Sequence, residues 1–217
     1  MRDNGIGFSN KTAQLLAGSH PFNRIDILTL NDDIQGTFAK HGIERLNHRV
    51  QTNGKWLSLT WRGKNVGLRR LFYVDGEGRK AVEHELFELP KELQGKGISK
   101  QVLSSLYEQY KVAGVQRIEL FANMDVGGYA WARYGFCTKN RNEALSAIRF
   151  SALTHKQEER IVAIIDEHFN SSSAPFPMNK IARLPYGKNA LLGSYWEGVL
   201  DLTDAQQRNV YVKYLRR

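Results

Sequence analysis

The stretch that decides the fold is Glu88-Leu89-Pro90-Lys91-Glu92-Leu93-Gln94-Gly95-Lys96-Gly97-Ile98-Ser99. Apolar residues recur every four positions from Ile98 onward and predict one face of a helix that ends at Gly114. The residues before the stretch, from Arg79 to Leu89, predict a strand. Two glycines therefore stand where a strand turns into a helix. Backbone amides without helical partners and the positive end of the helix dipole lie there, so we expect a diphosphate site.

The spacing within this stretch resembles a known motif. Gln94-x-x-Gly97-x-Ser99 is similar to the motif of the GNAT superfamily of acetyl-CoA-dependent N-acyltransferases, in which Gln or Arg is followed by two residues, Gly, one residue, and Gly or Ala. Ser99 departs from the last position but is small enough to fit. The order downstream is also similar: a helix, a strand ending at Asn123, a short helix, then Gly135-Phe136. The resemblance covers about residues 81–137 of the 217.

The resemblance implies a binding site for acetyl-CoA as co-substrate. The pantetheine arm is expected beside the strand that ends near Leu89, where a backbone N–H would stabilise the thioester oxyanion. A splayed junction between residues 82–89 and 117–123 would admit the arm, and Asn123, at the end of the second strand, is expected among the cofactor-binding residues. The diphosphate is expected on the backbone of six consecutive residues, Gln94, Gly95, Lys96, Gly97, Ile98 and Ser99.

The chemistry needs a base for the attacking amine and an acid for the departing thiolate. Related enzymes often keep a carboxylate on the strand before the motif, and Glu83 is the preferred base. The alternative is that Glu83-His84-Glu85 is one solvated stretch of strand. Trp131 stands where related enzymes usually have the tyrosine that acts as the general acid. Because an indole N–H is not given up at useful pH, Trp131 cannot replace that tyrosine. Tyr134, on the same helix face, is the candidate acid, with a purely structural core role as the alternative.

Element order predicts an α/β (α+β mixed sheet) fold. The resemblance adds a GNAT-like central sheet with a V-shaped splay and helices on both faces. Before the motif we expect a strand over 25–30, a helix N-cap within Asn31-Asp32-Asp33, and a helix to about Val50. Strands over 55–62 and 68–74 follow, with Leu57, Leu59 and Trp61 on one face of the first. A hairpin turn over 75–78 leads to the strand before the motif.

The remaining chain organisation is less distinctive. Residues 1–22 predict a loosely structured lead-in, and residues 23–217 one domain with a C-terminal helical extension over about 153–217. In that extension, Thr154-x-x-Gln157 predicts a capping box, residues 196–202 a late strand, and Thr203-x-x-Gln206 the cap of a terminal helix.

Composition narrows the class of protein. The 217 residues are 41% hydrophobic, which is enough for an ordinary core, and the single cysteine, Cys137, excludes an internal disulfide. A buried structural cysteine in a reducing compartment, the cytoplasm, is expected. No stretch approaches the roughly 20 apolar residues that span a bilayer, and residues 1–12 lack an apolar signal-peptide region. The histidines and the cysteine show no metal-ligand spacing, so we expect no metal site. The sequence also lacks the G-x-S-x-G elbow of serine hydrolases.

The net charge of +9 indicates an acidic partner, either a nucleic acid or the phosphates of a nucleotide cofactor. Aromatic and cationic residues interleave across one predicted hairpin, which is a pattern that can bind nucleic acid: Trp56, Trp61, Arg62, Lys64, Arg69, Arg70 and Tyr73. An ordinary sheet with tryptophans inside is the alternative. Some GNAT relatives acetylate the amino acid of charged tRNA. Such an acceptor would be consistent with both an acetyltransferase and a nucleic-acid-binding surface.

The sequence thus predicts an N-acyltransferase that moves an acetyl group from acetyl-CoA to a primary amine of an acceptor that remains open: a protein, a small molecule or a charged tRNA. The alternative is a protein that keeps the fold and the ligand but not the chemistry. The segment 126–136 also resembles GNAT-like segments of bacteriophage-associated and secreted bacterial proteins, which would fit a non-catalytic effector.

Overall fold

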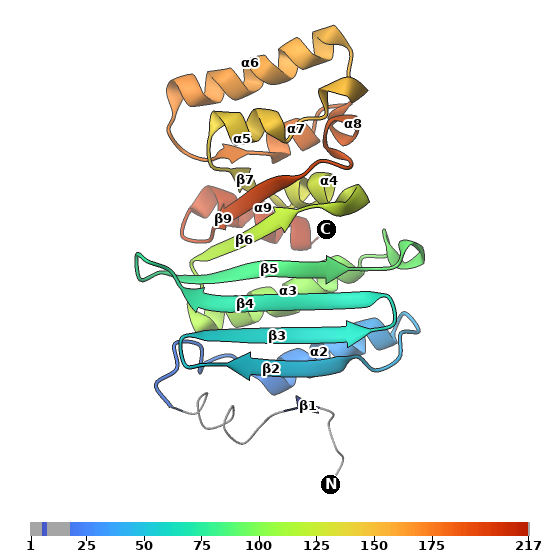
Figure 1. The fold of residues 1–217 in the computed structure, drawn as a ribbon, viewed down its shortest axis with the longest axis vertical. Helices are drawn as coiled ribbons and strands as arrows, with labels where there is room; N and C mark the ends of the chain where they lie inside the picture. The colour runs from blue at the N-terminus through green and yellow to red at the C-terminus, as the bar shows by residue number, and fades with distance from the viewer. Residues whose placement is uncertain (1–5, 8–17, 217) are drawn as a thin grey trace. The chain divides into compact units, whose positions relative to one another are not determined.

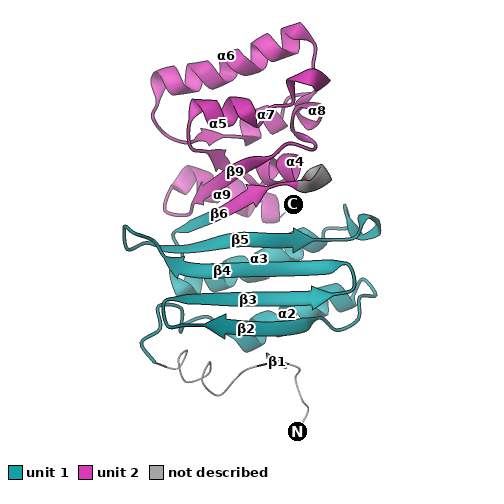
Figure 2. Ribbon diagram, in the orientation of Figure 1, with its two compact units in different colours: residues 1–118 teal, residues 119–217 magenta. Residues whose placement is uncertain are grey.

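The computed structural model describes residues 6–7 and 18–216 (Figure 1). The predicted lead-in over 1–22 lies mostly outside the described residues. The chain divides into two compact units, residues 1–118 and 119–217 (Figure 2). Helices and a mixed sheet, in which β1 is parallel to β2, β2 is antiparallel to β3 and β7 is antiparallel to β8, confirm the α/β class. The single domain over 23–217 stays a prediction.

The first unit is a sheet covered by two helices. Its strands follow the order β1-β2-β3-β4-β5. Figure 1 shows α2 and α3 on the same face of this sheet, where they pack against each other. The elements are β1 (Ile6–Gly7), α2 (Ile27–Ala39), β2 (Asn47–Thr52), β3 (Trp56–Gly63), β4 (Val66–Val74), β5 (Lys80–Glu88), the 3-10 helix η1 (Lys91–Leu93) and α3 (Ile98–Ala113).

Period-two patterning builds the core of this unit. Leu57, Leu59 and Trp61 of β3 are fully buried, which confirms the predicted apolar face. Phe72 of β4, which lies opposite Leu57, also belongs to the helix-facing side of the sheet. The predicted turn between β4 and β5 is confirmed, with Gly78 at a φ of 79° closing it.

The predictions before β3 were wrong in two places. No strand covers residues 25–30, because Asp26 caps α2: its carboxylate accepts hydrogen bonds from the backbone N–H and the hydroxyl of Thr29. Asn31 therefore lies inside the helix, buried, and its Oδ1 accepts from the indole N–H of Trp61. Residues 47–52 form β2, not helix, since their burial alternates from one residue to the next.

The second unit contains the later elements, and β6 (Arg117–Ala122) crosses into it from the first. Its strands follow the order β6-β9-β7-β8. The elements are α4 (Met124–Tyr134), β7 (Cys137–Thr138), α5 (Arg141–Ser146), the 3-10 helix η2 (Phe150–Ala152), α6 (His155–Ser171), β8 (Phe176–Pro177), α7 (Asn179–Ala182), α8 (Gly187–Leu191), β9 (Trp196–Asp201) and α9 (Ala205–Leu215).

Two predicted helix starts in this unit had different outcomes. The capping box of Thr154 and Gln157 is present at α6. At α9 the cap is Asp204 and not Thr203, because the Asp204 carboxylate accepts from the N–H groups of Gln206 and Gln207. The predicted late strand is confirmed as β9, and it lies between β6 and β7. The segment 153–217 therefore contributes a sheet strand as well as helices.

Candidate functional site

The turn before α3 depends on two left-handed glycines. Gly95 has a φ of 77° and Gly97 a φ of 78°, a backbone conformation that other residues rarely adopt. A Cβ at either position would meet no atom within 4 Å. The glycines are therefore needed for the path of the backbone and not to avoid a neighbouring side chain, and the space beside them is open to a ligand.

The start of α3 favours an anion. Gly97 is the N-cap residue, so no side chain caps the helix, and the first turn contains no acidic residue. Lys100 also lies in that first turn, near the positive end of the helix dipole. Lys96 is exposed in the turn itself. Lys100 was not among the predicted site residues, although its position in the first turn was a signal.

The other predicted loop residues divide into two groups. The Ile98 side chain is 1% exposed and anchors the helix in the core, so only its backbone is available to a ligand. Ser99 is half-buried and Gln94 is exposed. The Gln94 Nε2 donates to the carbonyl of Leu89 at 3.1 Å, which ties the turn back to the residue after β5.

A β-bulge lies in β5 beside the predicted base. Arg69 of β4 pairs with Leu86, but Leu71 pairs with Glu83, so His84 and Glu85 together oppose the single residue Arg70. The three residues from 83 to 85 are not one solvated stretch. Glu83 is half-buried, His84 is buried, and exposed Glu85 forms an ion pair with Arg69 at 2.9 Å. Bulges of this kind are common next to active sites.

A buried polar cluster supports this bulge from the helix side. Arg70 is fully buried, and its Nη1 donates to the carbonyls of Arg69 at 2.7 Å and Leu86 at 2.8 Å, one on each strand. The Nε2 of His84 lies 2.9 Å from the hydroxyl of Tyr110 on α3. Sequence reasoning missed this cluster, because Arg70 and Tyr110 lie 40 positions apart by their numbers.

Burial fixes the protonation states in the cluster. It lowers the pKa of His84 well below 6.5, and the positive charge of Arg70 lowers it further. Burial raises the pKa of Tyr110 to about 12, although Arg70 acts in the opposite direction. At neutral pH His84 is therefore uncharged and Tyr110 is protonated. The cluster holds the bulge in shape without adding a negative charge.

The predicted acid belongs to an aromatic cluster in the second unit. Tyr134 is 4% exposed, and its ring centroid lies 4.6 Å from that of Tyr214 and 5.5 Å from that of half-buried Trp131. Trp131 also makes an edge contact with Phe136 at 5.5 Å. Asn123 is exposed and precedes α4 without capping it. Glu83 and Tyr134 thus lie in different compact units.

Two other predictions concern single residues. Cys137 is buried and free, and burial raises the pKa of its thiol to about 12, as expected for a structural cysteine. A nucleic-acid partner stays a prediction, but part of the interleaved hairpin is not available as a binding surface. Arg70 and Trp61 are fully buried, Trp61 stacks on His48 at a centroid distance of 4.4 Å, and Arg69 pairs with Glu85. The hairpin is an ordinary sheet with its tryptophan inside at this point.

Among the side chains that the structure describes in residues 18–123 and 127–216, no three His, Cys, Asp or Glu gather as metal ligands would. No helix of that same part is apolar over enough residues to traverse a bilayer. The chain matches no protein-family model and no curated protein.

Proposed function

We propose that the chain is a GNAT-type N-acyltransferase that transfers an acetyl group from acetyl-CoA to a primary amine. The observation that carries the proposal is the turn from Gln94 to Gly97 at the start of α3, with two left-handed glycines and no side-chain cap. The order that follows it supports the resemblance: helix α3, strand β6, helix α4, then Gly135-Phe136.

The turn fits a diphosphate on chemical grounds. Backbone N–H groups at left-handed turns form concave sites for anions, and the helix dipole adds to their field. The first turn of α3 holds no carboxylate that would compete with the ligand, and Lys96 and Lys100 add positive charge. In this proposal the diphosphate binds the backbone from Gln94 to Ser99.

The bulge in β5 fits the role expected of the strand before the turn. A bulged strand bends and leaves a residue without its regular ladder partner. Such a strand offers backbone groups to the pantetheine arm, which would pair with it like an added strand. The N–H near Leu89 is then the candidate donor to the thioester oxygen, and Asn123 stays a candidate cofactor-binding residue.

The proposed reaction balances as follows. The amine nitrogen bonds to the thioester carbonyl carbon while the C–S bond breaks. One proton passes from the nitrogen to the Glu83 carboxylate, directly or through water. The departing CoA thiolate takes a proton from the Tyr134 hydroxyl, which water then restores. Glu83 is half-buried on the strand before the turn, which is where the resemblance expects the base.

A non-catalytic acyl-CoA-binding protein is the second candidate. The burial of Tyr134 within the aromatic cluster favours it, because a general acid must reach the departing sulfur. This candidate keeps the diphosphate turn and the ligand but assigns Trp131 and Tyr134 to packing alone.

The proposal is tested by measuring free CoA thiol released from acetyl-CoA in the presence of three kinds of acceptor: a small primary amine, a lysine-containing peptide and a charged tRNA. We expect release above the rate of spontaneous hydrolysis with at least one of them. Acetyl-CoA binding without release on any acceptor would support the second candidate instead. Absence of both binding and release would overturn the two together.

A further inference from the structure

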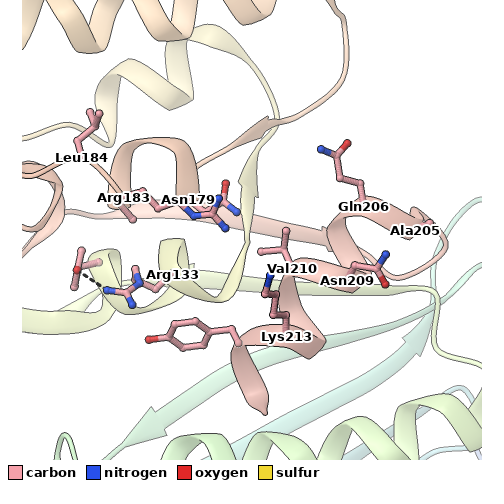
Figure 3. Close-up of a pocket in the computed structure, with 12 residues that line it drawn as sticks. Arg133, Asn179, Arg183, Leu184, Ala205, Gln206, Asn209, Val210 and Lys213 are labelled. Carbon is pink, nitrogen blue, oxygen red and sulfur yellow. Dashed lines mark hydrogen bonds between the residues drawn. The ribbon is translucent and has the colours of Figure 1, made fainter. Parts of the chain in front are cut away.

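A pocket of about 770 Å³ lies within the second unit, between α4, α7 and α9 (Figure 3). Its volume falls in the range of about 300–1,000 Å³ typical of small-molecule sites and is much larger than a single inorganic ion needs. Arg133 of α4 and Lys213 of α9 are both among the residues that line the pocket (Figure 3). Neither the resemblance nor the acyl-transfer chemistry assigns a role to this pocket.

The lining of the pocket is positively charged. Arg133, Arg183 and Lys213 contribute cations, and no Asp or Glu is among the lining residues. None of these three cations makes an ion pair with a side chain that the structure describes, which leaves out residues 124–126. The nearby carboxylate of Asp204 is already engaged, since it accepts from two backbone N–H groups of α9. The field inside the pocket therefore favours an anion.

Arg133 is held in place without being neutralised. Its Nη1 donates to the Tyr129 hydroxyl at 2.8 Å, and its guanidinium lies over the rings of Tyr129 at 5.7 Å and Tyr214 at 5.3 Å. The hydrogen bond to Tyr129 raises the pKa of Arg133 further above its ordinary value. The other donors of the planar guanidinium remain suited to a phosphate, which such a fork binds through two oxygens.

Asn179 adds an uncharged polar group to the lining. The residue is only 7% exposed, and its side-chain amide forms no hydrogen bond to any residue that the structure describes, so the amide is available to a ligand. The backbone next to Asn179 is held in place, because the N–H of Met178, just before α7, donates to the carbonyl of Phe136 at 3.1 Å. The amide is thus presented to the pocket by a fixed backbone.

We propose that this pocket binds a nucleotide-sized organic phosphate. Arg133, Arg183 and Lys213 hold the phosphate group, and the Asn179 amide pairs with the polar edge of the attached ring. Three cations match the charge of a phosphate ester better than that of a single carboxylate, and the volume leaves room for the ring and sugar. Gln206 and Asn209 of α9 offer further polar contacts to the sugar.

Calorimetry with ADP, adenosine and inorganic phosphate tests the proposal on the full chain. We expect ADP to bind, and adenosine and inorganic phosphate each to bind at least about tenfold more weakly, since each lacks half of the recognised groups. Lys213→Glu and Arg183→Glu, at exposed positions, should each weaken ADP binding at least about tenfold. Lys156→Glu, an equal charge change at an exposed position of α6 outside the pocket, should leave it unchanged.

Asn179→Asp adds a second arm, because it keeps the shape of the side chain but replaces the amide that pairs with the ring by a carboxylate, which also brings a negative charge into the pocket. It should also weaken ADP binding at least about tenfold, with thermal unfolding checking that the variant is folded. No ADP binding, equal binding of adenosine and ADP, or ADP binding that tolerates all three substitutions would overturn the proposal. ADP binding abolished by Gly97→Asp and kept by the pocket variants would place ADP on the α3 turn and overturn it too. Acetyl-CoA measured on the same variants reports separately on the proposed acyltransferase.

Discussion

The turn before α3 and the pocket beside α9 both suit an anion, but they are built differently. The turn is one contiguous stretch, from Gln94 to Ser99, in which the backbone is the recognising group. The pocket takes its cations from positions 133, 183 and 213, and there the side chains do the recognising. A backbone site needs glycines and a helix start, which a sequence displays directly. A side-chain site needs the fold to bring distant residues together.

The largest expected effect concerns the chemistry that the turn would serve. Glu83→Gln should lower the rate of acetyl transfer by at least about 10²-fold, because the amide cannot take the proton of the amine. Acetyl-CoA affinity should stay nearly constant. The assay is the release of CoA thiol with the best acceptor.

The matched control for this prediction is Glu85→Gln, two positions from Glu83 on β5. This substitution removes the ion pair between Glu85 and Arg69 of β4. An exposed pair of this kind contributes little, so the rate should change less than about threefold. Equal losses from the two substitutions would mean that the strand as a whole, and not the Glu83 carboxylate, matters for activity.

The next effect concerns Tyr134, the proposed acid, which lies in the second unit. Tyr134→Phe removes one hydroxyl and keeps the ring contacts to Trp131 and Tyr214. If Tyr134 protonates the thiolate, the rate should fall by roughly 10²-fold with acetyl-CoA affinity unchanged. Tyr129→Phe is the control, since its hydroxyl accepts from Arg133 in the pocket and should not affect transfer. A silent Tyr134→Phe would assign Tyr134 to packing alone and strengthen the non-catalytic candidate.

The two units should also differ in their response to acid. The buried histidines His20, His48 and His84 all belong to the first unit, whereas His155 of the second is exposed. Burial lowers the pKa of His48 from 6.5 to about 4. As the pH falls, His48 therefore takes up a proton near pH 6.5 in the unfolded chain but only near pH 4 in the folded chain. The contribution of neutral His48 to the free energy of unfolding is complete above pH 6.5 and is lost as the pH falls toward 4.

Each such histidine contributes up to about 1.4 kcal/mol per pH unit in that window. Urea unfolding between pH 7 and pH 5 measures the total, and His48→Phe, which keeps a ring on Trp61, should reduce the slope. Hydrogen exchange should show the first unit losing protection before the second. A flat pH profile, or earlier opening of the second unit, would contradict the prediction.

The smallest effects compare one helix cap from each unit. Asp26→Ala at α2 and Asp204→Ala at α9 should each cost about 1 kcal/mol, since each carboxylate satisfies N–H groups of a first helical turn. Thr203→Ala is the control at the position that sequence alone favoured as the α9 cap, and it should cost less. A larger loss at Thr203 than at Asp204 in denaturant unfolding would mean that the cap is assigned to the wrong residue.

The sequence predicted elements best where periodicity and glycine signals agreed. The strand, turn and helix around residues 79–114 were found because the period changes from two to about four beside the glycines. Residues 25–30 failed because a single cap, Asp26, turns an apolar run into a helix start. Residues 47–52 failed because their alternation includes His48, a polar residue that is nevertheless buried.

The candidate site was predicted only where it is contiguous. The turn followed from local spacing, and Glu83 was chosen as the base from the family resemblance. The cluster of Arg70, His84 and Tyr110 followed from neither, because its members meet through strand pairing and helix packing. The bulge beside Glu83 depends on a register shift between Arg69 and Leu71, which no single-strand pattern encodes. The pocket cations were missed because single charges on three separate elements resemble ordinary surface residues.

The central claim is that the left-handed turn before α3 binds acyl-CoA, and calorimetry of acetyl-CoA with the wild-type chain and Gly97→Asp tests it most directly. Aspartate disfavours the φ of 78° and brings a negative charge to the diphosphate. We expect the wild-type chain to bind and the folded variant to lose at least about tenfold in affinity, or 1.4 kcal/mol. No binding by the wild-type chain, or equal affinity in the folded variant, would contradict the claim.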